Sequence, residues 1–127
     1  MRDIKNNVDI QPSLAPAVYS ANQAENGTGV DLRGFDAAQV AFVSGAFTDG
    51  TFTPKVQESD DNSNWSDVAA SDLDGTLSNL SANAVQRVGY QGNKRYLRPV
   101  VTVSGATSGG AVSAVVVRGK PHLAPVA

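Results

Sequence analysis

Short runs of β-branched and aromatic residues alternate with turn residues along most of the chain. The clearest run spans residues 51–59, where Phe52, Pro54 and Val56 fall on one side of an extended chain and polar residues on the other. The same kind of pattern predicts further strands at 17–21, 29–32, 39–47, 65–68, 85–90, 95–103 and 111–118. About seven or eight short strands favour an all-β fold, an antiparallel β-sandwich of the jelly-roll or Ig-like type.

Two features predict how these strands connect and where the core lies. Asp49-Gly50 separates the strands at 39–47 and 51–59 and is a two-residue hairpin signal, so we expect these strands to pair. The last two strands are rich in valine on both pleat faces, as is typical of central strands. The residues expected in the core are Val101, Val103, Val115 and Val117.

Both ends of the chain are expected to be extended arms around a domain at residues 17–118. Residues 1–16 contain prolines and asparagines that interrupt any periodic pattern, and proline removes a backbone donor. Prolines likewise extend the tail at 119–127. Isolated apolar side chains in these arms are expected to dock on a partner: Ile4, Val8, Ile10, Leu14, Leu123 and Val126.

The composition indicates a single soluble domain. Hydrophobic residues make up 41% of the chain and charged residues 17%, and the formal net charge of -2 does not suit binding to nucleic-acid phosphates. No apolar run approaches the roughly 20 residues of a membrane-spanning helix, and no apolar segment of a signal peptide follows the first residues. We therefore expect synthesis in a cytoplasm, with neither membrane nor nucleic acid as a partner.

Side chains that commonly carry catalysis are scarce. The chain has no cysteine, which excludes thiolate nucleophiles, disulfides and thiolate metal sites. Its one histidine, His122, lies in the proline-flanked tail, where a general base would not be held in position. We therefore expect no enzymatic activity and no cofactor.

The acidic loop that follows residue 57 is the best candidate for a metal site. Asp60, Asn62 and Asn64 occupy the first, third and fifth places of a calcium-binding loop. The match then fails, because Trp65 stands where glycine is needed and the twelfth place lacks glutamate. We therefore expect no metal here, and a solvated loop whose Asx side chains bond to their own backbone.

Basic and aromatic residues interleave in one segment, and its members are Arg87, Tyr90, Lys94, Arg95, Tyr96 and Arg98. Arginine and tyrosine are enriched in protein interfaces, so this segment predicts a contact face. Stacking of nucleic-acid bases is the alternative, which the net charge disfavours. Trp65 is expected to fill the core, with stacking on a carbohydrate as its alternative role.

Three segments together resemble a known protein family. They are DLRGFD at residues 31–36, DGTFTP running on into ESDD between residues 49 and 61, and VGYQGNKRY at residues 88–96. In this order and spacing they resemble small virion proteins of tailed bacteriophages and related prophages, of the head decoration or cement type, over residues 28–121. The resemblance implies a capsid-bound β protein without enzymatic activity, and it supplies no active-site residue.

The partners that the resemblance implies are the major capsid protein and further copies of this chain, on the outer capsid surface of a virion. A neck, tail or fibre-associated virion component would share these sequence features, because the same sandwich serves many positions. A carbohydrate-binding module is the non-viral alternative. It requires two or three coplanar exposed aromatic rings, which Trp65 with Tyr90 or Tyr96 would have to supply.

Overall fold

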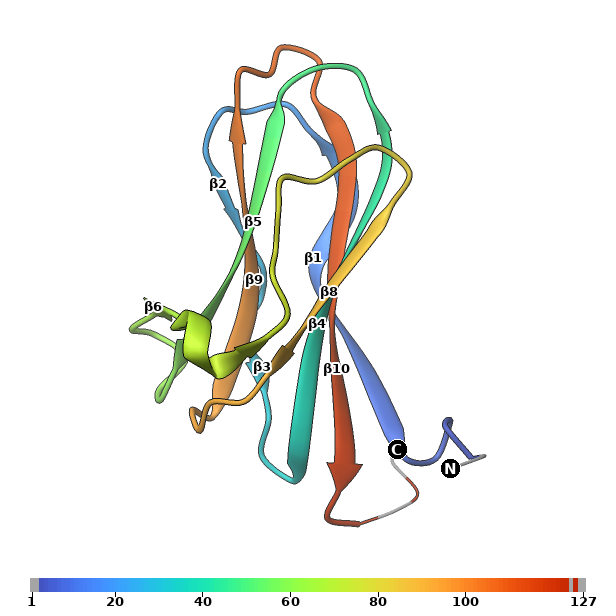
Figure 1. The fold of residues 1–127 in the computed structure, drawn as a ribbon, viewed down its shortest axis with the longest axis vertical. Coiled ribbons are helices and arrows are strands. Elements are labelled where there is room, and N and C mark those ends of the chain that lie inside the picture. The colour runs from blue at the N-terminus through green and yellow to red at the C-terminus, as the bar shows by residue number, and fades with distance from the viewer. Residues whose placement is uncertain (1–2, 124, 126–127) are drawn as a thin grey trace.

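Two antiparallel five-stranded sheets pack face to face as a sandwich in the computed structural model, which describes residues 3–123 and 125 (Figure 1). The first sheet has the order β1 (Val8–Tyr19), β10 (Gly110–Pro121), β4 (Phe35–Phe47), β8 (Val85–Tyr90) and β7 (Leu73–Asp74). The second sheet has the order β2 (Ala24–Asn26), β9 (Tyr96–Ser104), β5 (Thr51–Ser59) and β6 (Ser66–Asp67), with β3 (Val30–Asp31) also paired to β9. One 3-10 turn, η1 (Ala70–Asp72), precedes β7. The predicted all-β sandwich is confirmed.

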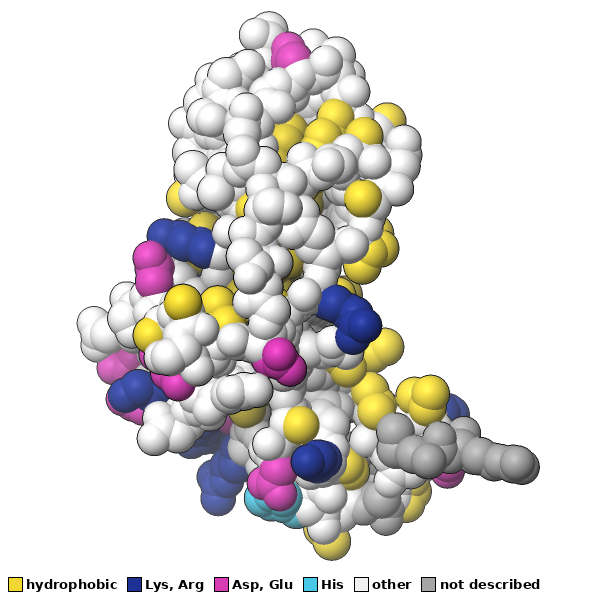
Figure 2. All heavy atoms as spheres, viewed as in Figure 1, with side chains coloured by type: hydrophobic (Ala, Val, Ile, Leu, Met, Phe, Trp, Pro, Cys, Tyr) yellow, Lys and Arg dark blue, Asp and Glu magenta, His cyan; other side chains and the backbone are white. Residues whose placement is uncertain are grey.

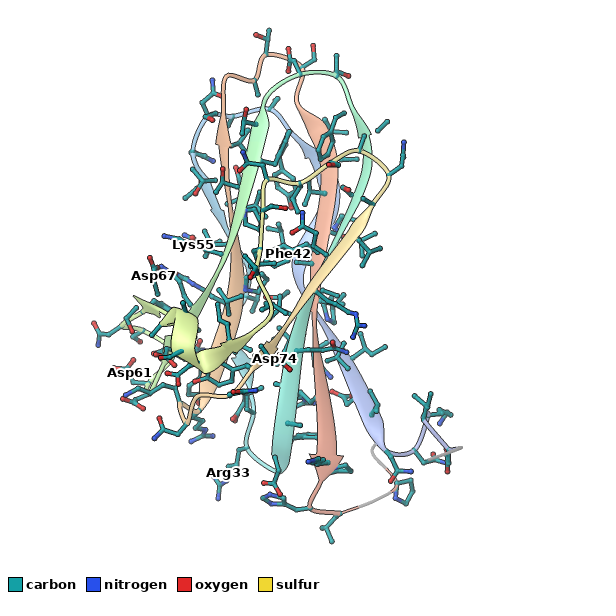
Figure 3. The ribbon with its side chains drawn as sticks, in the orientation of Figure 1. Arg33, Phe42, Lys55, Asp61, Asp67 and Asp74 are labelled. Atoms are coloured by element: carbon teal, nitrogen blue, oxygen red, sulfur yellow. The ribbon has the colours of Figure 1, made fainter. Side chains whose placement is uncertain are left out.

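The core lies between the inward faces of the two sheets, where β-branched and aromatic side chains alternate with outward residues. Figure 3 shows Phe42 of the first sheet between the sheets, and the second sheet contributes Phe52, whose ring stacks on Phe47 with centroids 4.6 Å apart. Val101 and Val103 are buried as expected. Other buried residues of this core are Val40, Val88, Leu97, Val112, Ala114 and Val116.

The expectation that Val115 and Val117 fill the core is wrong. Both residues lie half-buried on the outer face of the first sheet, and Val112 and Val116 point inward in their place. The valine run of β10 is apolar on both faces, so its sequence does not distinguish the inward set. The pleat orientation is decided by the pairing of β10 with β1 and β4.

The predicted hairpin at Asp49-Gly50 is also wrong, because β4 and β5 belong to different sheets. The Asp49 carboxylate instead accepts hydrogen bonds from the backbone N–H groups of Thr107, Ser108 and Gly109, at 2.8–3.0 Å for Oδ1. These bonds join the β4–β5 connection to the β9–β10 connection. Gly50 has a φ of 95°, as the Asp-Gly signal requires, but the turn carries the chain across the sandwich.

The predicted N-terminal arm is wrong for residues 8–16, which form most of β1 beside β10. The strand tolerates Pro12 because it lies at the sheet edge, and its register shifts on either side of Leu14. Leu14 is consequently buried in the core and is not free to anchor a partner. The C-terminal tail is shorter than expected as well, because β10 continues to Pro121 and pairs it with Phe35.

Candidate functional site

Charged side chains gather at one end of the sandwich, which we call the charged end. Figure 2 shows dark blue and magenta side chains over the lower half of the view, whereas the opposite end has few of them. The charged end is formed by the connections between β3 and β4, β5 and β6, and β8 and β9, together with the last residues of β10. Chain segments far apart in sequence therefore place their polar groups together here.

A largely buried ion pair lies inside the charged end, between Asp9 of β1 and Arg118 of β10. Their side chains are 12% and 17% exposed. Arg118 Nε donates to Asp9 Oδ2 at 2.9 Å, its Nη2 also contacts that oxygen, and its Nη1 donates to the Asp31 carbonyl at 2.8 Å. Burial by itself raises the pKa of Asp9, but hydrogen bonds from Gln11 and Arg118 outweigh it and hold that pKa below its ordinary value. Arg118 thereby connects the two sheets.

Two more ion pairs hold the β8–β9 connection against its neighbours. Arg95 makes a bidentate contact with Asp31, with Nε and Nη2 at 3.0 and 2.8 Å from the two carboxylate oxygens, and its guanidinium lies 5.0 Å from the Tyr96 ring centre. The hydrogen bond from Arg95 is the main reason why the pKa of Asp31 is lowered. Lys94 Nζ lies 2.9 Å from Asp60 Oδ2. Both pairs are at least one-third exposed, so they orient the loop more than they stabilise the fold.

Tyr90 anchors the same connection from inside. Its hydroxyl donates to Glu58 Oε1 at 2.7 Å and accepts from the backbone N–H of Lys94 at 3.0 Å. Burial and the Glu58 carboxylate raise the pKa of Tyr90, so the phenol stays neutral. Gly92 packs so closely on this ring that a Cβ there would lie 2.5 Å from the hydroxyl oxygen. Tyr90 is therefore a buried support for the loop.

A cavity of about 410 Å³ opens between the β3–β4 and β8–β9 connections. Its apolar walls come from Leu32, Phe35, Ala37 and Ala38. Its polar lining comes from Arg33, Asp36, Asp60, Asn93, Lys94 and Arg95, and Tyr90 and Gly92 complete it. Figure 3 shows Arg33 at the lower end of the molecule, pointing outward from the β3–β4 connection.

The predicted basic and aromatic contact face is divided by the fold. Tyr90, Lys94 and Arg95 line one cavity, and Tyr96 lies beside Arg95. Arg87 is exposed on β8, which belongs to the first sheet. Arg98 belongs to β9 of the second sheet and donates two hydrogen bonds to Gln57 Oε1, at 3.0 and 2.7 Å.

The expectation that Trp65 fills the core is wrong, because Trp65 is half-buried outside the core cluster. The Arg98 guanidinium lies 4.3 Å from its ring centre and covers one face of the ring. A Cβ at Gly29 would lie 2.8 Å from the Trp65 ring, so the chain also approaches the indole closely at that point. With Tyr90 buried as well, two of the three rings that the exposed platform of a carbohydrate-binding module would use are not freely exposed.

The acidic loop between β5 and β6 has the local bonding expected from its Asx residues. The Asp61 carboxylate accepts from the backbone N–H groups of Ser63 and Asn64, both at 2.9 Å, and from the Asn64 side chain at 2.7 Å. The backbone hydrogen bonds are the main cause of a strongly lowered pKa for Asp61. Within residues 3–123 and 125, no group of three or more His, Asp or Glu side chains is placed to hold a metal ion.

An exposed apolar surface on the outer face of the first sheet, which we call the apolar face, was not predicted from sequence. Its most exposed members are Ile10 (61%), Val18 (65%), Val43 (41%) and Val85 (63%). The strand register places Ile10 beside Val117, Pro12 and Ala41 beside Val115, and Val43 beside Val85, so the surface continues across four strands. The unusual two-sided valine pattern of β10 is the sequence signal that could have indicated it.

Three of the four remaining predicted partner anchors lie within the described residues. Val8 begins β1 and pairs with Gly119. Ile4 and Leu123 lie outside the strands and are exposed. Val126 lies outside the described residues.

Comparison with known proteins identifies the fold. No family model matches this chain, and no curated protein matches its sequence. The crystal structure of the PBSX exported protein XepA superposes with a TM-score of 0.59 and 22% sequence identity, over 94% of this chain and 39% of XepA. The chain shares the sandwich fold of XepA. Because the match covers 39% of XepA, this chain spans well under half of that protein's length.

A second solved structure, the SPBc2 prophage-derived protein YomS, aligns over 87% of this chain and 93% of its own, with a TM-score of 0.47 and 17% identity. At 22% identity, the likeness to XepA concerns the fold alone. No helix within residues 3–123 and 125 is long and apolar enough to cross a membrane.

Proposed function

We propose that this chain is a non-enzymatic structural protein of a tailed-phage virion, which binds the outer capsid surface and stabilises the head. The observation that carries the proposal is the apolar face. Contiguous exposed apolar surface is rare on monomeric proteins and marks interaction sites. The resemblance of three sequence segments to head decoration and cement proteins supports a capsid as the partner, and the fold shared with the PBSX exported protein XepA is compatible with it.

The two outer faces of the sandwich differ in the way that attachment to a shell would require. The outer face of the second sheet carries polar side chains, namely Thr53, Lys55, Gln57, Arg98 and Thr102. The apolar face, by contrast, is mostly apolar, and on β8 it includes one charged side chain, Arg87, which is paired with Ala41. Such a face gains free energy when it covers apolar surface on the major capsid protein or on a neighbouring copy of this chain.

This proposal moves the attachment site from the predicted arms to the sheet. Ile10 remains a contact residue, but as part of β1 and without the entropy loss of ordering an arm. Repetition over a symmetric shell multiplies weak contacts by effective concentration, so each copy requires only modest affinity.

The test is binding of the purified chain to shells that lack it, measured by co-sedimentation with increasing protein. We expect Val85→Asp to weaken binding at least tenfold, because it places a carboxylate in the apolar contact. Thr102→Asp is the matched control, an exposed strand position on the other outer face, and should bind as the unmodified chain does. Equal binding by both variants would show that the apolar face is not the attachment surface.

Copy number distinguishes a head role from a neck or tail role. Quantitative protein analysis of purified particles should find the chain at a number that scales with the capsid lattice, and particles without it should burst at a lower temperature. A number that matches the symmetry of a neck or tail ring instead would replace the head assignment.

A further inference from the structure

The cavity at the charged end has a charge pattern that restricts what it can bind. Its lysine and arginine at the β8–β9 connection are already paired, Lys94 with Asp60 at 2.9 Å and Arg95 with Asp31 at 2.8 Å. Its Asp36 carboxylate lies 2.8 Å from His122 Nε2. Arg33 also lines the cavity, and it is the one lining cation for which no ion pair is found within residues 3–123 and 125. A tight anion site requires several cations without partners, and a cation site requires carboxylates without partners, so this rim favours a ligand without net charge.

The paired groups nevertheless retain hydrogen-bonding capacity. A carboxylate accepts at about four lone-pair positions and a guanidinium has five N–H donors, and each pair here uses only part of that capacity. The amide of Asn93 adds a donor and an acceptor on the same rim. The cavity therefore offers closely spaced donors and acceptors with little net charge.

One part of the cavity wall is apolar and includes an aromatic ring. Leu32, Phe35 and Ala38 line it, and the Arg118 guanidinium lies 4.3 Å from the Phe35 ring centre and supports that ring. A sugar ring presents C–H groups on its faces and hydroxyl groups around its edge. It can therefore pack against this wall while its hydroxyls reach the polar rim.

The cavity is held in shape before any ligand arrives. The backbone N–H of Lys94 donates to the Tyr90 hydroxyl at 3.0 Å, and the backbone N–H of Gln91 donates to the Asp72 carbonyl at 2.7 Å. The Arg95–Asp31 contact joins the same loop to β3. A loop fixed at several points loses little conformational entropy on binding.

From charge balance, wall chemistry and rigidity, we propose that this cavity binds a neutral carbohydrate, as one sugar residue of a glycan chain. A volume of about 410 Å³ is within the range of small-molecule sites. The proposal goes beyond capsid attachment and does not depend on it. The cavity residues Ala38 and Tyr90 lie at one end of the β4–β8 pairing, and Val43 and Val85 of the apolar face lie at the other.

The test is saturation-transfer difference NMR of the full chain with the methyl glycosides of glucose, galactose, N-acetylglucosamine and rhamnose. We expect transfer to the ring protons of at least one glycoside. Asn93→Ala and Phe35→Leu should each weaken its binding about tenfold, because one removes rim hydrogen bonds and the other the aromatic face. Asn93 is exposed, so the fold should tolerate its replacement. Arg87→Gln, an exposed arginine away from the cavity, is the control and should bind normally.

Two results would overturn the proposal. One is the lack of transfer to all four glycosides, or transfer that neither cavity variant changes. The other is binding of inorganic phosphate that Arg33→Gln abolishes, which would assign an anion site instead. Neither result bears on attachment to shells, where Val85→Asp is the diagnostic variant, so the two proposals fail separately.

Discussion

We expect the Asp9–Arg118 ion pair to contribute more to the free energy of unfolding than the exposed ion pairs of the charged end. The variant Arg118→Met tests this expectation. Methionine keeps much of the apolar stem of arginine but removes the guanidinium. The Asp9 carboxylate then stays inside the sandwich with only Gln11 as a side-chain donor, at 2.8 Å. The Asp31 carbonyl and the Phe35 ring also lose their contacts with the guanidinium.

Removing one partner of a fully buried ion pair costs about 3–5 kcal/mol, because the other charge is left uncompensated. Side-chain exposures of 12% for Asp9 and 17% for Arg118 allow some access to water and place the expected loss near the lower end of that range. We therefore expect the free energy of unfolding to fall by about 3 kcal/mol. For a domain of this size, that lowers the thermal midpoint by about 12 °C.

The assay is urea unfolding of both proteins between pH 3 and pH 7, with Arg87→Met as an exposed control expected within about 0.5 kcal/mol of the unmodified chain. The folded pKa of Asp9 lies below the ordinary 3.8, so its ionised form stabilises the fold above pH 3.8. That stabilisation is lost as the pH falls through the lowered folded pKa. The difference between the unmodified chain and Arg118→Met should consequently be largest at pH 7 and shrink below pH 3.8.

The double variant Asp9→Leu/Arg118→Met separates the cost of an orphaned charge from the value of the pair. Because neither charge remains buried, we expect it to recover to within about 1 kcal/mol of the unmodified chain. A loss for Arg118→Met that is under 1 kcal/mol, or one that is independent of pH, would refute the reasoning.

Three other predictions test the packing and the connections. Val103→Ala should lower the free energy of unfolding by about 1–3 kcal/mol, whereas Val117→Ala on the outer face should cost under 1 kcal/mol in the same urea titration; equal losses would contradict the inward assignment. Asp49→Ala should lower the thermal midpoint because three backbone N–H groups lose their acceptor. The pKa of Asp49 is lowered in the folded chain, so this difference should shrink below pH 3.8 as the pH falls toward that lowered pKa, and a difference independent of pH would argue against it. Deletion of residues 1–7 should leave the cooperative thermal transition in place. Deletion of residues 1–14 should abolish that transition, because it removes about half of β1 together with the buried Leu14. A cooperative transition that survives the longer deletion would show that this part of β1 is dispensable.

The positions of most strands follow from local sequence. The predicted strands at 51–59 and 85–90 coincide with β5 and β8, and those at 39–47, 95–103 and 111–118 lie within or beside β4, β9 and β10. Alternation with a period of two, bounded by turn residues, is a property of neighbouring residues. The sandwich class follows from the number and spacing of such segments. The local bonding of the acidic loop around Asp61 could likewise be predicted, because Asx side chains bond to a backbone only two or three residues away.

Strand partners were decided by tertiary structure. Asp49-Gly50 specifies a turn, but the pairing of β4 depends on how well it matches β10 and β8, which are distant in sequence. Pro12 disfavours a strand in the local sequence. The strand β1 nevertheless forms, because it pairs along most of its length with β10. The pairing of β10 with β1 and β4 also determines which face of β10, a strand with valines on both faces, points toward the core. The opposite side, with Val115 and Val117, then becomes part of the apolar face.

The candidate sites depend even more on the folded chain. Tyr90 and Arg95 were recognised as functional candidates, but their cavity also requires Phe35 and Asp36, which come from a connection far away in sequence. In the sequence, Arg118 is a polar residue at the end of a predicted strand. In the folded chain, the pairing of β1 with β10 places Asp9 beside it. A side chain's partners, and with them its charge state and its exposure, are set by segments that meet only when both sheets have formed.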